Sequence, residues 1–359
     1  MTRPPELENR GHYASVLGRS HTGFCRSCDA ACSRRARAPL PIVGSIVSLS
    51  AKFRITSHLG LATVVLMYAL IILGSVVRTT GSGLACPDWP LCQGRLFPPL
   101  ELNAIIEWVH RLVALLVSVL LVGTVAWVGL HRQLRARLGA LAGVALLLLL
   151  AQILLGALTV WKLLDPSIVG GHLAVALLLF SSMIVLTLVA GHEGSPAASD
   201  GSLPDPRPAT LLPALSVACL LIYGQAVLGG VVSASGASLA CPDWPTCAGQ
   251  WMPSMQGLVG IQMAHRLGAY FLTVYLVILA WMSRRASDPV VASVGPVLVG
   301  LVLGQIVIGV LNLWLGIQVW LSALHLANAA GMLAVAIAAT FRVASMPRRQ
   351  VALSAVPAS

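Results

Sequence analysis

The sequence predicts an all-α integral membrane protein, with eight transmembrane helices arranged as two homologous, parallel four-helix bundles. The chain has 359 residues, of which 57% are hydrophobic and only 10% are charged, whereas soluble domains have roughly 25% charged residues. Eight apolar stretches are close to the ~20 residues that a helix needs to cross a bilayer. A motif with two cysteines and a following His-Arg pair occurs twice at the same spacing.

The eight apolar stretches and the basic residues between them predict the topology. The expected spans are 59–77, 108–130, 139–160, 168–190, 210–231, 261–282, 293–313 and 320–341. With both termini in the cytoplasm, 18 of the 23 Lys and Arg residues fall on inner segments, as the positive-inside rule requires. We therefore expect a multi-pass cell-membrane protein whose net charge of +11 reflects topology, not nucleic-acid binding.

Composition also predicts the domain boundaries. Residues 1–54 are polar and Arg-rich and contain no secretory signal, so we expect a disordered cytoplasmic tail. The two halves, 55–190 and 210–342, are separated by a Gly-, Ser- and Pro-rich linker at 191–209. Residues 343–359 form a second cytoplasmic tail.

A metal site made by Cys25, Cys28 and Cys32 is the alternative to a disordered first tail. Zinc sites pair one such cluster with a second. The tail has no second pair, so reduced, unliganded cysteines are favoured.

The repeated motif shows that the halves are homologous. Leu84–Gly94 and Leu239–Gly249 are identical at nine of eleven positions, and the cysteines and the His-Arg pairs recur 155 positions apart (86 and 241, 110 and 265). Further on, Gln-Ile-x-x-Gly recurs at 152 and 305 with an offset of 153. Each half has four helices, so the two halves point the same way across the membrane.

Four histidines are predicted at one depth, where the second and fourth helices of each half begin on the outer side; they are His110, His172, His265 and His325. Polar residues at that depth are costly unless they face the bundle interior and have partners. Two histidines without a third ligand make a poor zinc site, but they suffice as the axial ligands of a haem iron inside a four-helix bundle. The alternative is four histidines that each bond to a neighbouring helix.

Other residues near these histidines suit a haem. Arg111 and Arg266, next to the expected ligands, are predicted to pair with haem propionates. Small residues near the helix ends are expected to let a flat macrocycle approach; these are Gly170, Gly171, Gly268 and Gly331.

The paired cysteines, Cys86 with Cys92 and Cys241 with Cys247, are six positions apart and face an oxidising compartment. Each pair is expected to close a small local disulfide. Such a disulfide either holds its loop or takes part in thiol exchange. The first pair fits both roles, and for the second the structural role is favoured.

The halves differ beside the histidines. Glu107 has Gln262 at its repeat position, and Arg78 has Ser233. A carboxylate at membrane depth is expensive unless it is paired or functional. The first half is therefore predicted to be a reaction site, and the second a site for a tightly held cofactor or for electron transfer.

The segment Glu107-Trp108-Val109-His110-Arg111, the two cysteine loops and the four histidines resemble the haem A synthase family over about residues 55–342. The resemblance implies oxidation of a methyl group of haem O to the formyl group of haem A, through successive hydroxylations and loss of water. It further implies that His110 and His172 hold the substrate haem with Glu107 nearby, and that His265 and His325 ligate a haem b cofactor.

Membrane lipid surrounds such an enzyme, and the haem O synthase and cytochrome oxidase assembly factors are its expected protein partners. Two other functions fit parts of the pattern. A b-type haem electron-transfer protein or haem carrier explains the four histidines but not the presence of Glu107 and Arg78 in one half only. A secondary transporter fits the repeat, yet transporters place broken helices near the midplane, and here the polar residues cluster at the outer ends.

Overall fold

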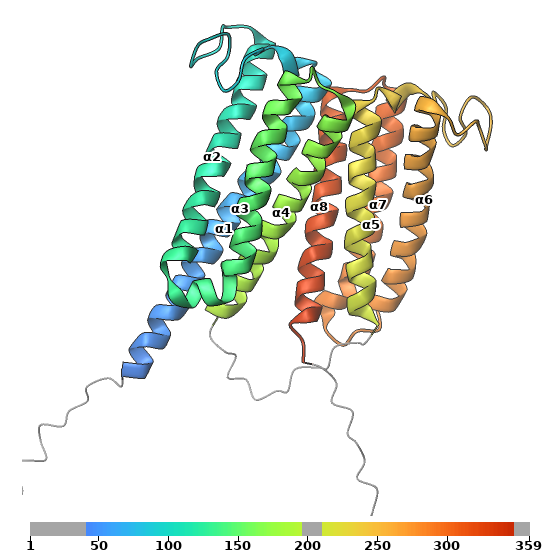
Figure 1. The fold of residues 1–359 in the computed structure, drawn as a ribbon. Coiled ribbons are helices and arrows are strands. Elements are labelled where there is room, and N and C mark those ends of the chain that lie inside the picture. The colour runs from blue at the N-terminus through green and yellow to red at the C-terminus, as the bar shows by residue number, and fades with distance from the viewer. Residues whose placement is uncertain (1–40, 196–209, 348–359) are drawn as a thin grey trace, which may run out of the picture. The chain divides into compact units, whose positions relative to one another are not determined.

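The computed structural model describes residues 41–195 and 210–347 (Figure 1). These ranges contain eight helices long and apolar enough to cross a membrane and no strand. The protein is thus all-helical and multi-pass, as predicted. The helices are α1 Pro41–Thr79, α2 Leu102–Leu130, α3 Arg132–Trp161, α4 Pro166–Gly194, α5 Leu211–Ala234, α6 Gly257–Ser283, α7 Pro289–Trp314 and α8 Val319–Ala344. Cys25, Cys28 and Cys32 lie outside the described residues.

Both cysteine loops lie at the same end of the helices, so α1 and α5 point the same way (Figure 1). Each loop starts with a short 3-10 turn, Ser82–Leu84 in the first half and Ala237–Leu239 in the second. The opposite end carries the tight α2–α3 turn at His131. The parallel orientation expected for duplicated halves is therefore present.

One apolar core joins all eight helices. It runs from Met67 on α1 to Val343 on α8 without a break. α4 packs against both α5 and α8, so the first four helices are held to the last four through apolar contacts. The division into two separate bundles stays a prediction.

Aspartate and proline start two of the helices in the same way. Asp165 accepts a hydrogen bond from the Ser167 N–H, and Asp288 accepts from the N–H groups of Val290 and Val291; a proline follows each aspartate. Proline fits the first helical position because the N–H it lacks has no partner inside the helix. Arg342 on α8 also pairs with Asp288 at 2.7 Å, which ties the start of α7 to the end of α8.

Seven of the eight helices begin before their predicted spans, α1 and α2 among them. α1 starts at Pro41, so residues 41–54 are helical and not part of a disordered tail. α2 starts at Leu102, six positions before the expected span, because the apolar run that precedes Glu107 continues the helix. His110 therefore lies inside α2, eight residues or about 12 Å past its start.

Glycine sets the distance between α6 and α7. A Cβ atom at Gly295 would overlap the backbone of Ala280 on α6, whereas a Cβ at Gly300 would meet nothing within 4 Å. We expect Gly295→Ala to separate these helices at a cost of about 1–3 kcal/mol, seen as a lower melting temperature in detergent. Gly300→Ala is the matched control on the same helix. Equal melting temperatures for both variants would contradict the close packing.

Candidate functional site

A cavity of about 1500 Å³ lies among the helices near the cysteine loops. Its wall includes all four predicted histidines, one each from α2, α4, α6 and α8, together with Glu107, Gln262 and Arg78. The structure thus places all four histidines in the wall of one cavity, and their pairing as ligands stays a prediction.

Each histidine ring lies against a glycine of the preceding helix. A Cβ atom on that glycine would come within 2.9 to 3.3 Å of the ring Cε1. Ordinary Cβ contacts are longer, so only glycine leaves the ring in place. The four contacts are Gly74 with His110, Gly156 with His172, Gly229 with His265, and Gly309 with His325.

These are not the glycines named from the sequence. A Cβ at Gly170 would meet Val231, one at Gly268 would meet Gln225, one at Gly331 would meet Tyr68, and one at Gly171 would meet nothing within 4 Å. The signal that finds the right ones is the repeat itself. Gly74 and Gly229 share the 155 offset, and Gly156 and Gly309 share the 153 offset.

Three of the four histidines have a ring nitrogen without a hydrogen-bond partner among the described residues. The Nδ1 atoms of His110, His172 and His325 are buried and have no hydrogen-bond partner among the described residues. These nitrogens lie within 3.5 to 3.9 Å of the place that a Cβ on the neighbouring glycine would take, so they face the preceding helix. No group of three or more His, Cys, Asp or Glu side chains in the described ranges is placed to hold a metal ion. Paired imidazoles without further ligands fit an iron whose other ligands come from a porphyrin.

Glutamine side chains hold the histidines on their helices. Gln152 Nε2 lies 3.2 Å from His172 Nε2, and Gln225 Nε2 lies 3.0 Å from His265 Nδ1. Gln225 also donates to the His265 carbonyl at 2.8 Å. Gln225 has Leu70 at its repeat position, so this clamp is confined to the second half.

Glu107 is buried and fully engaged. One carboxylate oxygen accepts from Arg111 Nη2 at 2.6 Å, and the other accepts from the Cys86 N–H at 2.8 Å. Glu107 therefore links the His110 helix to the first cysteine loop. At the repeat position, Gln262 makes one long contact of 3.5 Å to the Ser238 carbonyl, and its Oε1 has no described partner.

Both predicted propionate-binding arginines are used to hold the loops. Arg111 donates to the carbonyls of Cys86, Asp88 and Leu91. Arg266 donates to the equivalent carbonyls of the second loop, at Cys241, Asp243 and Thr246. These bonds occupy the Nη atoms of both guanidinium groups, so the structure gives the two arginines a positioning role.

The loops are closed by the two predicted disulfides, Cys86–Cys92 and Cys241–Cys247. An aspartate inside each ring organises the turn. Asp88 accepts from the N–H groups of Gly94 at 2.8 Å and Gln93 at 2.5 Å. These bonds, the Gly94 one foremost, lower the pKa of the Asp88 carboxyl.

Asp243 is held in the same way in the second loop. It accepts from the Thr246 hydroxyl and from the N–H groups of Gly249 at 2.9 Å and Ala248 at 2.6 Å. The Thr246 bond contributes most, and together they lower the pKa of Asp243 to about 2. Both loops are thus built around an ionised carboxylate.

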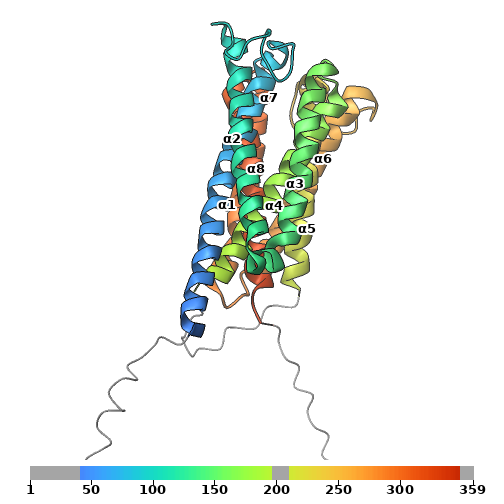
Figure 2. The same cartoon turned by 60° about the vertical axis from the view of Figure 1, so that its left-hand side comes forward.

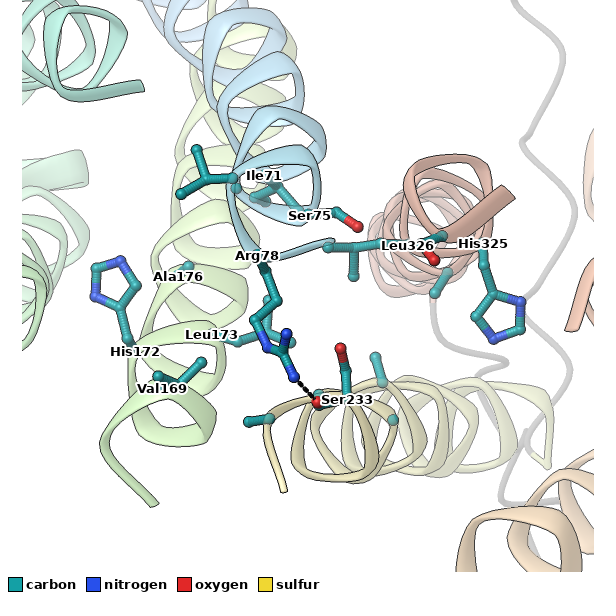
Figure 3. Close-up of a pocket in the computed structure, with 18 of the residues that line it drawn as sticks. Ile71, Ser75, Arg78, Val169, His172, Leu173, Ala176, Ser233, His325 and Leu326 are labelled. Atoms are coloured by element: carbon teal, nitrogen blue, oxygen red, sulfur yellow. Dashed lines mark hydrogen bonds between the residues drawn. The ribbon is translucent and has the colours of Figure 1, made fainter. Parts of the chain in front are cut away.

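Arg78 lies away from the first histidine pair. Figure 3 shows it between α1, α4, α5 and α8, on the opposite side of α4 from the His172 ring. It donates to the carbonyl of Ser233, its own counterpart 155 positions on in the repeat. The guanidinium has no carboxylate partner among the described residues. The sequence analysis placed Arg78 beside the first site, whereas the structure places it between the halves.

The sequence model of the cytochrome oxidase assembly protein family matches residues 57–105 and 101–337. The chain belongs to this family. Its similar relatives include the protein named Heme A synthase from Symbiobacterium thermophilum, which is 34% identical over 233 residues, or 64% of this chain and 75% of the relative.

Two further relatives of this name show the same likeness. The one from Bacillus licheniformis is 32% identical over 236 residues, covering 63% of this chain and 75% of the relative. The one from Shouchella clausii is 32% identical over 263 residues, covering 70% and 85%. The resemblance inferred from the motifs is confirmed.

The aspartate in each loop has a testable effect on disulfide protection. The pKa of Asp243 in the folded protein lies below the ordinary value of about 3.9. The ionised carboxylate therefore stabilises the folded loop above pH ~4, and this stabilisation is lost as the pH falls towards 2. We expect Asp243→Ala to speed reduction of Cys241–Cys247 by a phosphine severalfold at neutral pH. Wild-type protein should approach that rate only near pH 2.

Gln250→Ala, in the same loop, is the control and should behave like the wild type. The readout is the rate of thiol labelling at Cys241 and Cys247. If wild type and Asp243→Ala are reduced at the same rate at pH 7, the aspartate does not hold the loop.

Proposed function

We propose that this protein is a membrane-bound haem A synthase, which oxidises a methyl group of haem O to the formyl group of haem A for a terminal oxidase. The observation that carries the proposal is two pairs of histidines facing one cavity, in a chain that belongs to the cytochrome oxidase assembly protein family. The alternative of a plain electron carrier leaves the Glu107–Arg111 pair in one half only without a purpose.

We assign the substrate to the first half, residues 55–190, with His110 and His172 as ligands of haem O. We assign a resident haem b to the second half, residues 210–342, with His265 and His325 as ligands. The support is the difference in polarity: Gln225 clamps His265, and its equivalent in the first half is Leu70. The second site makes more hydrogen bonds to its histidines, which suits a cofactor that stays bound.

When bound, haem iron supplies the redox chemistry that the protein side chains lack. The chain contributes positioning and charge. Glu107 lines the cavity and is fixed at both oxygens by Arg111 and the Cys86 N–H. We propose that this carboxylate stabilises positive charge that develops at the methyl carbon or accepts its proton, because a preorganised charge needs no reorientation during reaction.

Arg78 is the cationic side chain best placed for a haem carboxylate, since its guanidinium lies in the cavity wall and has no described carboxylate partner. Arg111 and Arg266 are assigned instead to holding the cysteine loops. Through Cys86, the first disulfide loop is bonded directly to Glu107. Any change in that loop, including reduction of its disulfide, therefore acts on the proposed reaction site.

The proposed setting is the cell membrane, with the cysteine loops outside and both termini in the cytoplasm. This follows from the basic residues on inner segments. Haem O is a membrane-embedded intermediate, so we propose that the protein receives it from the haem O synthase and passes haem A to oxidase assembly factors.

The test is chromatography of haems extracted from cells that express this chain together with a haem O synthase. We expect haem A in these cells, and a roughly hundredfold loss of it with Glu107→Gln, while the purified variant keeps its haem. Gln262→Glu, the reciprocal change in the second half, is the matched control and should still give haem A. Accumulation of haem O alone with the wild-type chain would overturn the enzyme assignment. Loss of bound haem in Glu107→Gln would make Glu107 structural.

A further inference from the structure

The cavity reaches the outer surface of the helices in the first half. Three of its lining residues there are also exposed: Leu112 at 38% and Leu115 at 58% on α2, and Ile153 at 39% on α3. A side chain that both lines a cavity and is exposed marks an opening. All three are apolar, and they lie on helices that span the bilayer, so the opening faces lipid.

The second half has no such opening on its helices. Among the described residues, every helical residue that lines this half of the cavity is buried or half-buried. Tyr270 stands where the first half has Leu115, and Ile306 stands where it has Ile153; both are half-buried. The Tyr270 hydroxyl is buried and has no described hydrogen-bond partner, so the ring extends inward across the position that is open in the first half.

The helix arrangement agrees with a lateral opening. α2 and α3 meet at their tight turn and diverge towards the cysteine-loop end (Figure 2). Above the opening, Leu96 and Phe97 of the first loop also line the cavity, whereas their counterparts Trp251 and Met252 do not. An apolar wall therefore continues from the loop down to Ile153.

The opening lies deeper in the bilayer than the proposed iron ligand. Leu115 follows His110 by five residues, which is about 7.5 Å along the helix towards the membrane centre. A group that leaves the cavity here enters the hydrocarbon region directly. Only an apolar group can do so at low cost.

We propose that the opening between α2 and α3 is the site of the isoprenoid tail of haem O, and that Leu115 and Tyr270 decide which half accepts a tailed haem. Haem O carries a long apolar tail and haem b has none, so an open and a closed site separate them by shape. The side chain at position 115 leaves room for the tail to lie between the helices and extend into lipid. The Tyr270 ring fills the same place in the second half and excludes it.

This inference rests on the proposed function for the identity of the tailed ligand. The test uses binding, so its outcome is separate from product formation. Protein purified from cells that make no haem O is titrated with haem O or with added haem b, and the absorption spectrum reports ligation. If the wild-type chain binds haem O but makes no haem A, the enzyme assignment fails and the tail site remains.

The decisive variant is Leu115→Tyr, which copies the second half into the first. We expect it to weaken haem O binding at least about tenfold, and to change binding of tailless haem at the same site less than about twofold. Leu116→Tyr is the control, since Leu116 is 48% exposed but does not line the cavity. Ile153→Trp blocks the opening from α3 and should act like Leu115→Tyr.

Unchanged haem O binding in both Leu115→Tyr and Ile153→Trp would overturn the proposal. An equal loss of tailed and tailless haem would overturn it too, since these residues would then shape the macrocycle pocket. The reciprocal variant, Tyr270→Leu, is expected to let haem O replace haem b in the second site. If the second site still rejects haem O, Tyr270 is not the residue that excludes the tail.

Discussion

The contact between a histidine ring and a glycine on the preceding helix determines how this protein keeps imidazoles inside a membrane. It occurs four times, and at each place a Cβ atom would displace the ring. Because the helices approach closely at these points, each ring is held along one edge in the wall of the cavity. Without the glycines the histidines would turn towards other partners or push the helices apart. The cavity, the pairing of the histidines and the proposed haem sites all depend on this contact.

The duplicated framework lets the two halves differ without changing the geometry of the ligands. In the first half an ion pair, Glu107 with Arg111, connects the ligand helix to a disulfide loop. In the second half Arg266 makes the short hydrogen bonds to the loop, and Gln262 adds only one long contact to the Ser238 carbonyl. Gln152 contacts His172 in the first half, whereas the Gln225 contact with His265 has no equivalent there because Leu70 takes that position. One half thus has a charge and an opening to lipid, and the other has a closed, hydrogen-bonded pocket.

Much of this arrangement follows from the sequence, because the repeat fixes which residues share a depth. The spacing of His110 and His172, and of their counterparts 155 and 153 positions later, was enough to predict the pairs. The hydrogen-bond acceptors of Arg111 and Arg266 were not predictable, because they are loop carbonyls whose positions depend on the turn around Asp88 or Asp243. Arg78 was placed with the wrong neighbours because its long side chain crosses to Ser233, and spacing along α1 does not determine that direction.

We propose that one cavity holds two haems, each on its own pair of histidines. The most direct test is the haem-to-protein ratio of protein purified from cells that make haem O. We expect two haems per chain in the wild type. We expect one per chain in the double variant His110→Ala/His172→Ala, and also one in the double variant His265→Ala/His325→Ala. The haem that remains should be haem b in the first case and a tailed haem in the second. A single haem that is lost from both double variants would contradict two separate haem sites.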